Sequence, residues 1–152
     1  MKRFQYQLEN VLNYKYRVLD DLKSEHAVIV RHVNQKQEEI QRLNHELTEY
    51  ETEFDQTKKE GMSIESYRLF GMCIEKMEQV IDEEKEQLKL LKKKEEKKKE
   101  EVVEAKVDSS KYEKLKERKW KEYQKLEQKV EEAFVEEFVT RSYVREGMSK
   151  KV

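Results

Sequence analysis

Apolar residues recur along the first third of the chain at alternating intervals of four and three residues. The series has three polar members and runs Leu8, Leu12, Lys15, Leu19, Leu22, His26, Ile29, Val33, Lys36, Ile40, Leu43, Leu47, Tyr50 and Phe54. This alternation is typical of the seam of a left-handed coiled coil, because 3.5 residues per turn keep one stripe facing one partner helix. We interpret the polar members as residues that fix the register of the pairing.

A short polar stretch around Gly61 ends the first series. Gly61 can adopt the left-handed conformation that closes a helix, and Ser63 can cap the next helix, with Ser66 at its third position. The four-three series then resumes, fades and recovers, through Phe70, Ile74, Met77, Ile81, Glu84, Leu88, Leu91, Val102, Ala105, Tyr112, Tyr123, Leu126, Val130 and Ala133.

The pattern therefore predicts a helix over about 4–59, a turn over about 60–63 and a second helix over about 64–146. Two helices that are joined by so short a connection run antiparallel, which pairs Phe54 with Phe70.

The second helix is the longer of the two. The same antiparallel pairing places Phe4 opposite Trp120, so residues from about Lys121 onward extend beyond the first helix. We predict an all-α fold with a single domain over 1–152. Its architecture is an antiparallel two-helix coiled-coil hairpin with an overhanging, longer second helix.

Two stretches of the second helix lack apolar residues. Residues 92–101 read KKKEEKKKEE, which we interpret as a solvated helix supported by Glu–Lys pairs four residues apart. Residues 108–110 read Asp-Ser-Ser and are a candidate break in the helix.

Composition limits the chemistry that such a chain can perform. Charged residues make up 44% and hydrophobic residues 36%, below the share of about 45–50% in an ordinary globular domain. A thick core that could shift the pKa of a catalytic group is therefore not expected. We assign no catalytic residue, no cofactor and no small-molecule substrate.

Metal and disulfide sites are not predicted either. The three histidines, His26, His32 and His45, do not share one helix face within a turn, and Cys73 is the only cysteine. No apolar run is long enough for a signal peptide or for a membrane span of about 18 residues. We expect a reducing, cytoplasmic location.

Nucleic acid is not an expected partner. The chain has 33 basic and 34 acidic residues. Glutamates are interleaved with the lysines of residues 85–99, and they cancel most of the field that would attract phosphates.

Two apolar surfaces are wider than one partner helix can cover. Beside the seam after the turn lie Leu69, Met72, Cys73 and Val80, and near the end of the chain lie Leu126, Val130, Ala133, Phe134, Val135, Phe138 and Val139. Contiguous apolar surface on a soluble protein usually marks a docking site. The alternatives for the surface after the turn are thicker packing and a homodimer. The alternative for the surface near the end of the chain is that the first residues fold back over it.

The two ends of the chain carry a family resemblance. The opening has aromatic and aliphatic residues at Phe4, Tyr6, Leu8, Val11 and Leu12, and the end runs Val135, Glu136, Glu137, Phe138, Val139, Thr140, Arg141. Together with the spacing of Tyr67, Phe70, Ile74, Met77 and Ile81, these stretches resemble the FliJ family. That family is a small coiled-coil component of the bacterial flagellar export apparatus.

The resemblance implies a non-enzymatic stalk that binds the hexamer of the export ATPase and couples it to the membrane export gate, with an additional role in escorting export chaperones. It implies peripheral association with the inner face of the cell membrane at the flagellar base. Contacts with the ATPase ring are implied for Phe4, Leu8, Leu12, Phe134, Glu137, Phe138 and Arg141. Contacts with the gate or chaperones are implied for Phe70, Cys73, Ile74, Met77, Val80 and Glu84. A generic homodimeric coiled-coil structural or adaptor protein is the alternative.

Overall fold

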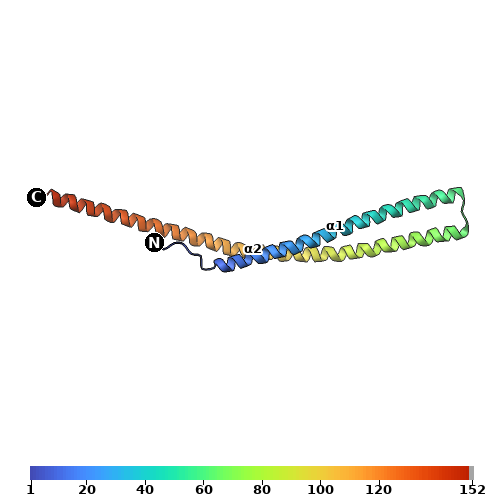
Figure 1. Ribbon diagram of the computed structural model, residues 1–152, viewed down its shortest axis with the longest axis horizontal. Coiled ribbons are helices and arrows are strands. Elements are labelled where there is room, and N and C mark those ends of the chain that lie inside the picture. Colours follow the sequence, from blue (N-terminus) through green and yellow to red (C-terminus); the bar gives the residue numbers. More distant parts are fainter. Residues whose placement is uncertain (151–152) are drawn as a thin grey trace. The chain divides into compact units, whose positions relative to one another are not determined.

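The computed structural model describes residues 1–150. It contains two helices, α1 (Glu9–Glu60) and α2 (Ile64–Ser149), and no strand within the described residues (Figure 1). The predicted all-α fold of two long helices in contact is confirmed. The last two residues of the predicted domain lie outside the described part of the chain.

Contacts within the chain group into two units, which we treat separately. The tip unit consists of Leu19–Glu104 and contains the turn. The terminal unit consists of Met1–Val18 together with the chain from Ala105 onward. The first helix begins at Glu9 rather than near residue 4, so the terminal unit opens with a short non-helical segment of residues 1–8, the N-terminal strap.

The turn of the tip unit follows its sequence. Gly61 has a φ of 98°, in the left-handed region that glycine adopts without a steric cost, and its N–H donates to the Lys58 carbonyl at 3.3 Å. Ser63 caps α2, because its Oγ accepts the N–H of Ser66 at 3.1 Å. Both sequence predictions for the turn are confirmed.

The seam of the tip unit is the face along which α1 and α2 pack. Ile40 and Ile81 are buried on it, and the rings of Phe54 and Phe70 stack with their centroids 5.1 Å apart, as the antiparallel pairing predicted. Every member of the predicted α1 series is buried or half-buried. Because the seam is only one stripe wide, most of these side chains keep some contact with solvent.

The polar members of the seam have partners on the opposite helix. His26 Nε2 lies 2.8 Å from Glu95 Oε1, and Lys36 Nζ lies 2.6 Å from Glu84 Oε2. Lys98 Nζ lies 2.9 Å from a carboxylate oxygen of Glu25 on α1.

These pairs correct the interpretation of the charged run at 92–101. The run is helical, but it is not solvated on all sides. Glu95 and Lys98 are half-buried on the seam. They are paired there with His26 and Glu25 of α1, respectively.

In the terminal unit the paired helices are most tightly packed at Leu12 and Ser109, each only 2% exposed. The candidate break at 108–110 does not occur, because α2 runs through these residues without interruption. Ser109 occupies a seam position, and its hydroxyl donates to the Lys106 carbonyl of the preceding turn at 3.0 Å. A small side chain with an internally satisfied hydroxyl is compatible with a buried helix interface.

Candidate protein-binding surfaces

The first candidate surface, the tip patch, lies on α2 just after the turn. It consists of four exposed apolar side chains, and Leu69 and Met72 are 62% and 67% exposed. The other two members, Ile64 and Tyr67, were not among the predicted docking residues, although Tyr67 contributed to the family resemblance. Positions next to a helix start are poorly covered by a partner helix that is itself ending, which is the signal that could have identified them.

The six predicted gate or chaperone residues lie nearer the seam. All are half-buried, namely Phe70, Cys73, Ile74, Met77, Val80 and Glu84. Glu84 accepts the hydrogen bond of Lys36 described above. These residues are therefore less exposed than the tip patch, and Val80 and Glu84 lie eight and twelve residues farther along α2 than Met72.

Aromatic contacts hold the tip patch in place. The ring of Phe54 lies 5.5 Å from that of Tyr67, and Lys58 Nζ lies 3.8 Å from the centroid of Phe54, within the range of a cation–π contact. The hydrogen bond between Tyr50 and Cys73, followed by burial, raises the pKa of the Tyr50 hydroxyl above its ordinary value. The tip is thus a packed end from which Leu69 and Met72 project.

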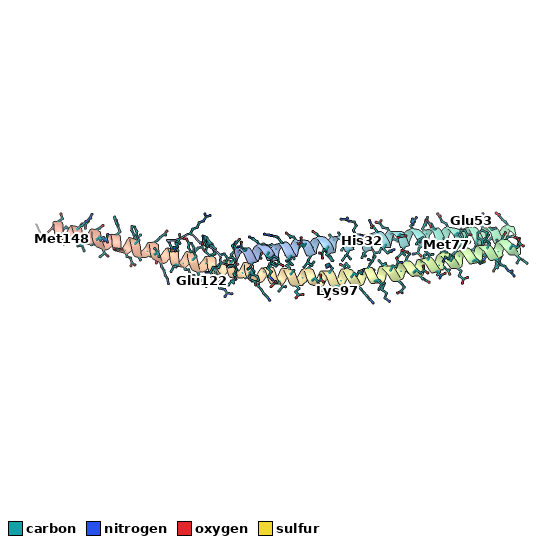
Figure 2. All side chains as sticks on the ribbon, turned by 60° about the horizontal axis from the view of Figure 1, so that its bottom comes forward. His32, Glu53, Met77, Lys97, Glu122 and Met148 are labelled. Atoms are coloured by element: carbon teal, nitrogen blue, oxygen red, sulfur yellow. The ribbon has the colours of Figure 1, made fainter. Side chains whose placement is uncertain are left out.

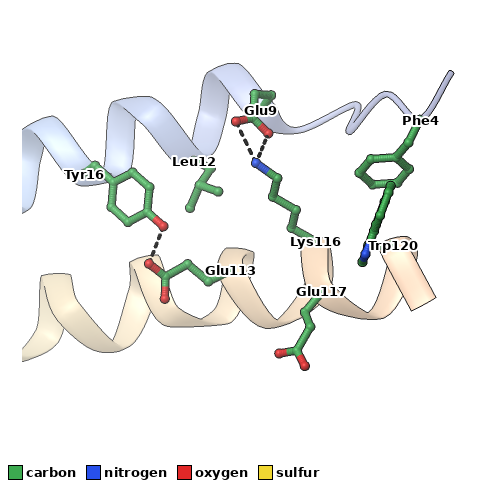
Figure 3. Close-up of a pocket in the computed structure, with 8 residues that line it drawn as sticks. All are labelled: Phe4, Glu9, Leu12, Tyr16, Glu113, Lys116, Glu117 and Trp120. Carbon is green, nitrogen blue, oxygen red and sulfur yellow. Dashed lines mark hydrogen bonds and ion pairs between the residues drawn. The ribbon is translucent and has the colours of Figure 1, made fainter. Parts of the chain in front are cut away.

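A groove of about 410 Å³ lies between the two helices of the terminal unit (Figure 3). Its charged groups are already paired, since Lys116 Nζ lies 2.7 Å from a Glu9 oxygen and the Tyr16 hydroxyl donates to Glu113. That hydrogen bond, with burial and the carboxylate charge, raises the pKa of Tyr16 to about 12. Glu117 also lines the groove, and one of its carboxylate oxygens lies 2.7 Å from Lys121 Nζ.

The N-terminal strap crosses α2 beside this groove. Phe4 packs edge-on against Trp120, with ring centroids 5.1 Å apart, and its centroid lies 5.5 Å from that of Tyr123. The predicted pairing of Phe4 with Trp120 is therefore confirmed. The contact comes from the strap and not from a helix, because α1 has not yet begun at Phe4.

The second candidate surface, the overhang face, covers the last part of α2, where no second helix lies beside it (Figure 1). Side chains project all round this single helix, which carries Met148 near its end (Figure 2). Its exposed large apolar residues are Leu126, Val130, Phe134, Val135, Phe138, Val139, Tyr143, Val144 and Met148. Phe134 is 70% exposed, so the strap does not cover this face.

The predicted ATPase-ring residues fall into two groups. Phe134, Glu137, Phe138 and Arg141 are exposed on the overhang, where Arg141 and Glu137 form an ion pair at 2.8 Å. The others lie against α2 where it is still paired: Leu12 is buried, and Phe4 and Leu8 are half-buried. The structure therefore brings together the residues within each group.

Within residues 1–150, no group of three or more His, Cys, Asp or Glu side chains could hold a metal ion. In the same part of the chain, neither helix is both long and apolar enough to cross a membrane.

The fold and the two surfaces define a class of protein, a long helical hairpin that offers exposed apolar helix faces for docking. The chain belongs to the flagellar FliJ protein family, whose sequence model matches residues 4–148. It is therefore a component of the flagellar protein export apparatus, in a family of structural parts rather than known enzymes. No curated protein and no solved structure matches the chain.

Proposed function

We propose that this chain is the coiled-coil stalk of the flagellar export apparatus, binding the export ATPase hexamer through its terminal unit and the export gate or export chaperones through its tip unit. It works in the cytoplasm, at the inner face of the membrane. The observation that carries this proposal is the overhang face, an apolar helix surface that nothing in the described chain covers.

The distribution of the overhang face favours a surrounding partner. Leu126, Val130, Phe134 and Phe138 recur every four residues, and so do Val135, Val139 and Tyr143. These two rows lie on different sides of the helix, because residues four apart share a side and neighbouring residues do not. One partner helix covers a single stripe, whereas the inner wall of a ring contacts several sides at once.

The length of the overhang face suits the same partner. From Leu126 to Met148 the helix extends about 33 Å at 1.5 Å per residue. In this proposal Phe134 and Phe138 supply apolar anchors, and Glu137 and Arg141 supply charged contacts around them. Leu12, which is buried where α1 meets α2, fixes where the overhang begins, and Phe4 and Leu8 lie beside it on the strap.

At the other end, the tip patch supplies the contact with the gate or a chaperone. Leu69 and Met72 project beyond the seam, and Met adapts its shape to different partners. Cys73 and Val80 form the adjoining edge of that contact. Phe70, Ile74, Met77 and Glu84 support it from the seam.

The experiment for the ring contact uses the full chain with the purified export ATPase of the same flagellar system. Wild-type protein is expected to raise ATP hydrolysis and ring assembly. Phe134→Glu combined with Phe138→Glu is expected to weaken this stimulation by at least about tenfold, because it places two charges in a desolvated contact. Circular dichroism should show unchanged helix content, since both side chains are exposed.

A matched control adds the same two charges to exposed polar positions of the same helix, as Gln124→Glu with Gln128→Glu. It should stimulate the ATPase nearly as well as wild type. An intact wild-type chain that does not stimulate, or a control that fails as badly as the phenylalanine variant, would count against the proposal.

A homodimeric structural coiled coil is the second candidate, because the four exposed apolar side chains of the tip patch would also suit a second copy of the chain. Sedimentation can distinguish the homodimer from the export stalk. It compares wild type with the double variant Leu69→Glu and Met72→Glu. Phe70 and Met77 are unsuitable for this test, because they are half-buried on the seam and their substitution would disturb the hairpin itself. A wild-type dimer that dissociates in the variant would support this second candidate.

A further inference from the structure

The N-terminal strap contacts the rest of the terminal unit at few points. Its backbone joins α1 through two hydrogen bonds, in which the N–H of Glu9 donates to the Tyr6 carbonyl at 3.1 Å and the N–H of Leu12 donates to the Leu8 carbonyl at 2.9 Å. Alternate side chains Phe4, Tyr6 and Leu8 are half-buried, and Gln5 and Gln7 between them are exposed. The strap thus rests on α2 by one edge only.

Two hydrogen bonds supplement the ring contacts of Phe4. The Tyr6 hydroxyl donates to the Tyr112 carbonyl at 3.0 Å, and the Tyr123 hydroxyl donates to the Lys2 carbonyl at 3.0 Å. Each such bond adds little to the stability of the closed strap, because water competes for the same donors and acceptors. Tyr112 belongs to the seam series, but Tyr6 bonds to its backbone carbonyl, so neither bond replaces a side-chain contact between α1 and α2.

The strap also fits its surface loosely. A cavity of about 270 Å³ lies along it and is lined by residues 4–8 with Leu115 and Lys119. A second, open pocket of about 350 Å³ is lined by Arg3 and Phe4 of the strap and by Trp120, Tyr123 and Glu127 of α2. Such gaps forfeit the dispersion contacts that a well-packed segment would make.

The surface beneath the strap continues into the overhang face. Tyr123, which the strap covers, is followed in the four-three series by the exposed Leu126 and Val130. Trp120 is 41% exposed even with Phe4 against it. The strap therefore occupies one end of an apolar strip whose other end is open.

We propose that the strap is a displaceable cover, which opens while the two helices stay paired and so extends the binding face for the ATPase ring from the overhang to Trp120 and Tyr123. This inference rests on the proposed function for the identity of the occupant. Opening of the strap does not depend on that identity. The strap competes with the ring for the same aromatic surface, and a partner that binds the open form loses apparent affinity in proportion to the closed fraction.

The test uses the single tryptophan, Trp120, as a reporter in the full chain. Phe4→Ala removes the ring that packs on Trp120, and Gln5→Ala, at an exposed strap position, is the matched control. Quenching of Trp120 fluorescence by acrylamide should increase in Phe4→Ala and stay at the wild-type level in Gln5→Ala. Helix content and the thermal midpoint of Phe4→Ala should match wild type, because Phe4 lies on the strap, outside both helices.

The same variants are then titrated with the purified export ATPase. If the strap is closed about nine-tenths of the time, Phe4→Ala should bind up to about tenfold more tightly than wild type. Quenching that stays at the wild-type level in Phe4→Ala overturns the inference. A lower thermal midpoint of Phe4→Ala also overturns it, because the strap would then be part of the packed hairpin and not a separate cover. Weaker binding by a stably folded Phe4→Ala overturns the competition, because Phe4 would then contact the ring directly. If neither wild type nor variant binds, the proposed function and the competition both fail, and the quenching result still decides whether the strap opens.

Discussion

The Lys36–Glu84 pair gives the sharpest test of how the seam is stabilised. Its atoms are 2.6 Å apart, and the two side chains are only 19% and 18% exposed. A buried pair of this kind is often no more stabilising than two well-packed apolar residues, whereas loss of one partner leaves a charge without compensation. The perturbation is therefore a cycle of Lys36→Leu, Glu84→Leu and the double variant.

The structure predicts which of the two single variants loses more stability. Without Glu84, Lys36 still donates to Gln87 at 2.9 Å and lies 3.9 Å from Glu39. Without Lys36, Glu84 has no other hydrogen-bond partner within residues 1–150. We therefore expect Lys36→Leu to lower the free energy of unfolding by about 1–3 kcal/mol and Glu84→Leu to change it by less than about 1 kcal/mol.

The double variant should be more stable than wild type. Each leucine would bury about four-fifths of its side chain, a gain of roughly 1–2 kcal/mol per residue, offset by about 1 kcal/mol for the lost pair. The net gain of about 1–3 kcal/mol corresponds to a thermal midpoint raised by several degrees. Leucine, lysine and glutamate have similar helix propensities, so the helices themselves should not change.

The assay is urea unfolding followed by circular dichroism, with all four proteins compared at equal concentration. The reasoning would be refuted by a double variant less stable than wild type, or by single-variant changes that sum to that of the double. A more damaging effect of Glu84→Leu than of Lys36→Leu would contradict the assignment of alternative partners.

Three further predictions concern the backbone, the helix interface and pH. Gly61→Ala should lower the free energy of unfolding by about 1–2 kcal/mol because of the left-handed φ, whereas Gly71→Ala, inside α2 with open space around it, should raise it by about 0.5–1 kcal/mol in the same urea assay. Ser109→Leu should cost about 1–3 kcal/mol by overpacking a position that is only 2% exposed, and Ser109→Ala should stay within about 0.5 kcal/mol of wild type. Because the pKa of Tyr16 is raised to about 12 by its hydrogen bond to Glu113, its stabilising contribution is complete below pH 10.0 and is lost as the pH rises through about 12. An NMR titration of this tyrosine should show the raised pKa, and Glu113→Ala should return it toward the ordinary value.

The helices and the turn were predictable from the sequence because they depend on local spacing. The four-three alternation identified the seam, and Gly61 and Ser63 marked the turn by conformational preferences that each residue carries with it. Ser109 lies four residues after Ala105 and three before Tyr112, where the four-three spacing calls for a seam residue. The predicted series omits it, because its polar side chain beside Asp108 made that stretch a candidate break.

The candidate site was predictable only in outline. The excess of apolar residues after the turn and near the end of the chain indicated two docking surfaces, since one seam cannot cover them. Which residues project from those surfaces depends on where the opposite helix ends. Leu69 and Met72 are exposed, whereas Phe70 and Met77, equally apolar, are half-buried.

The sequence by itself determined the helical periodicity, the turn and the family, because each depends on residue type and spacing along the chain. The tertiary structure alone decided which charged residues meet across the seam and how the strap of residues 1–8 lies. These contacts join positions far apart in the sequence, such as Lys36 with Glu84 and Tyr6 with Tyr112. No local preference of either residue specifies such a partner, so only the packed helices could show it.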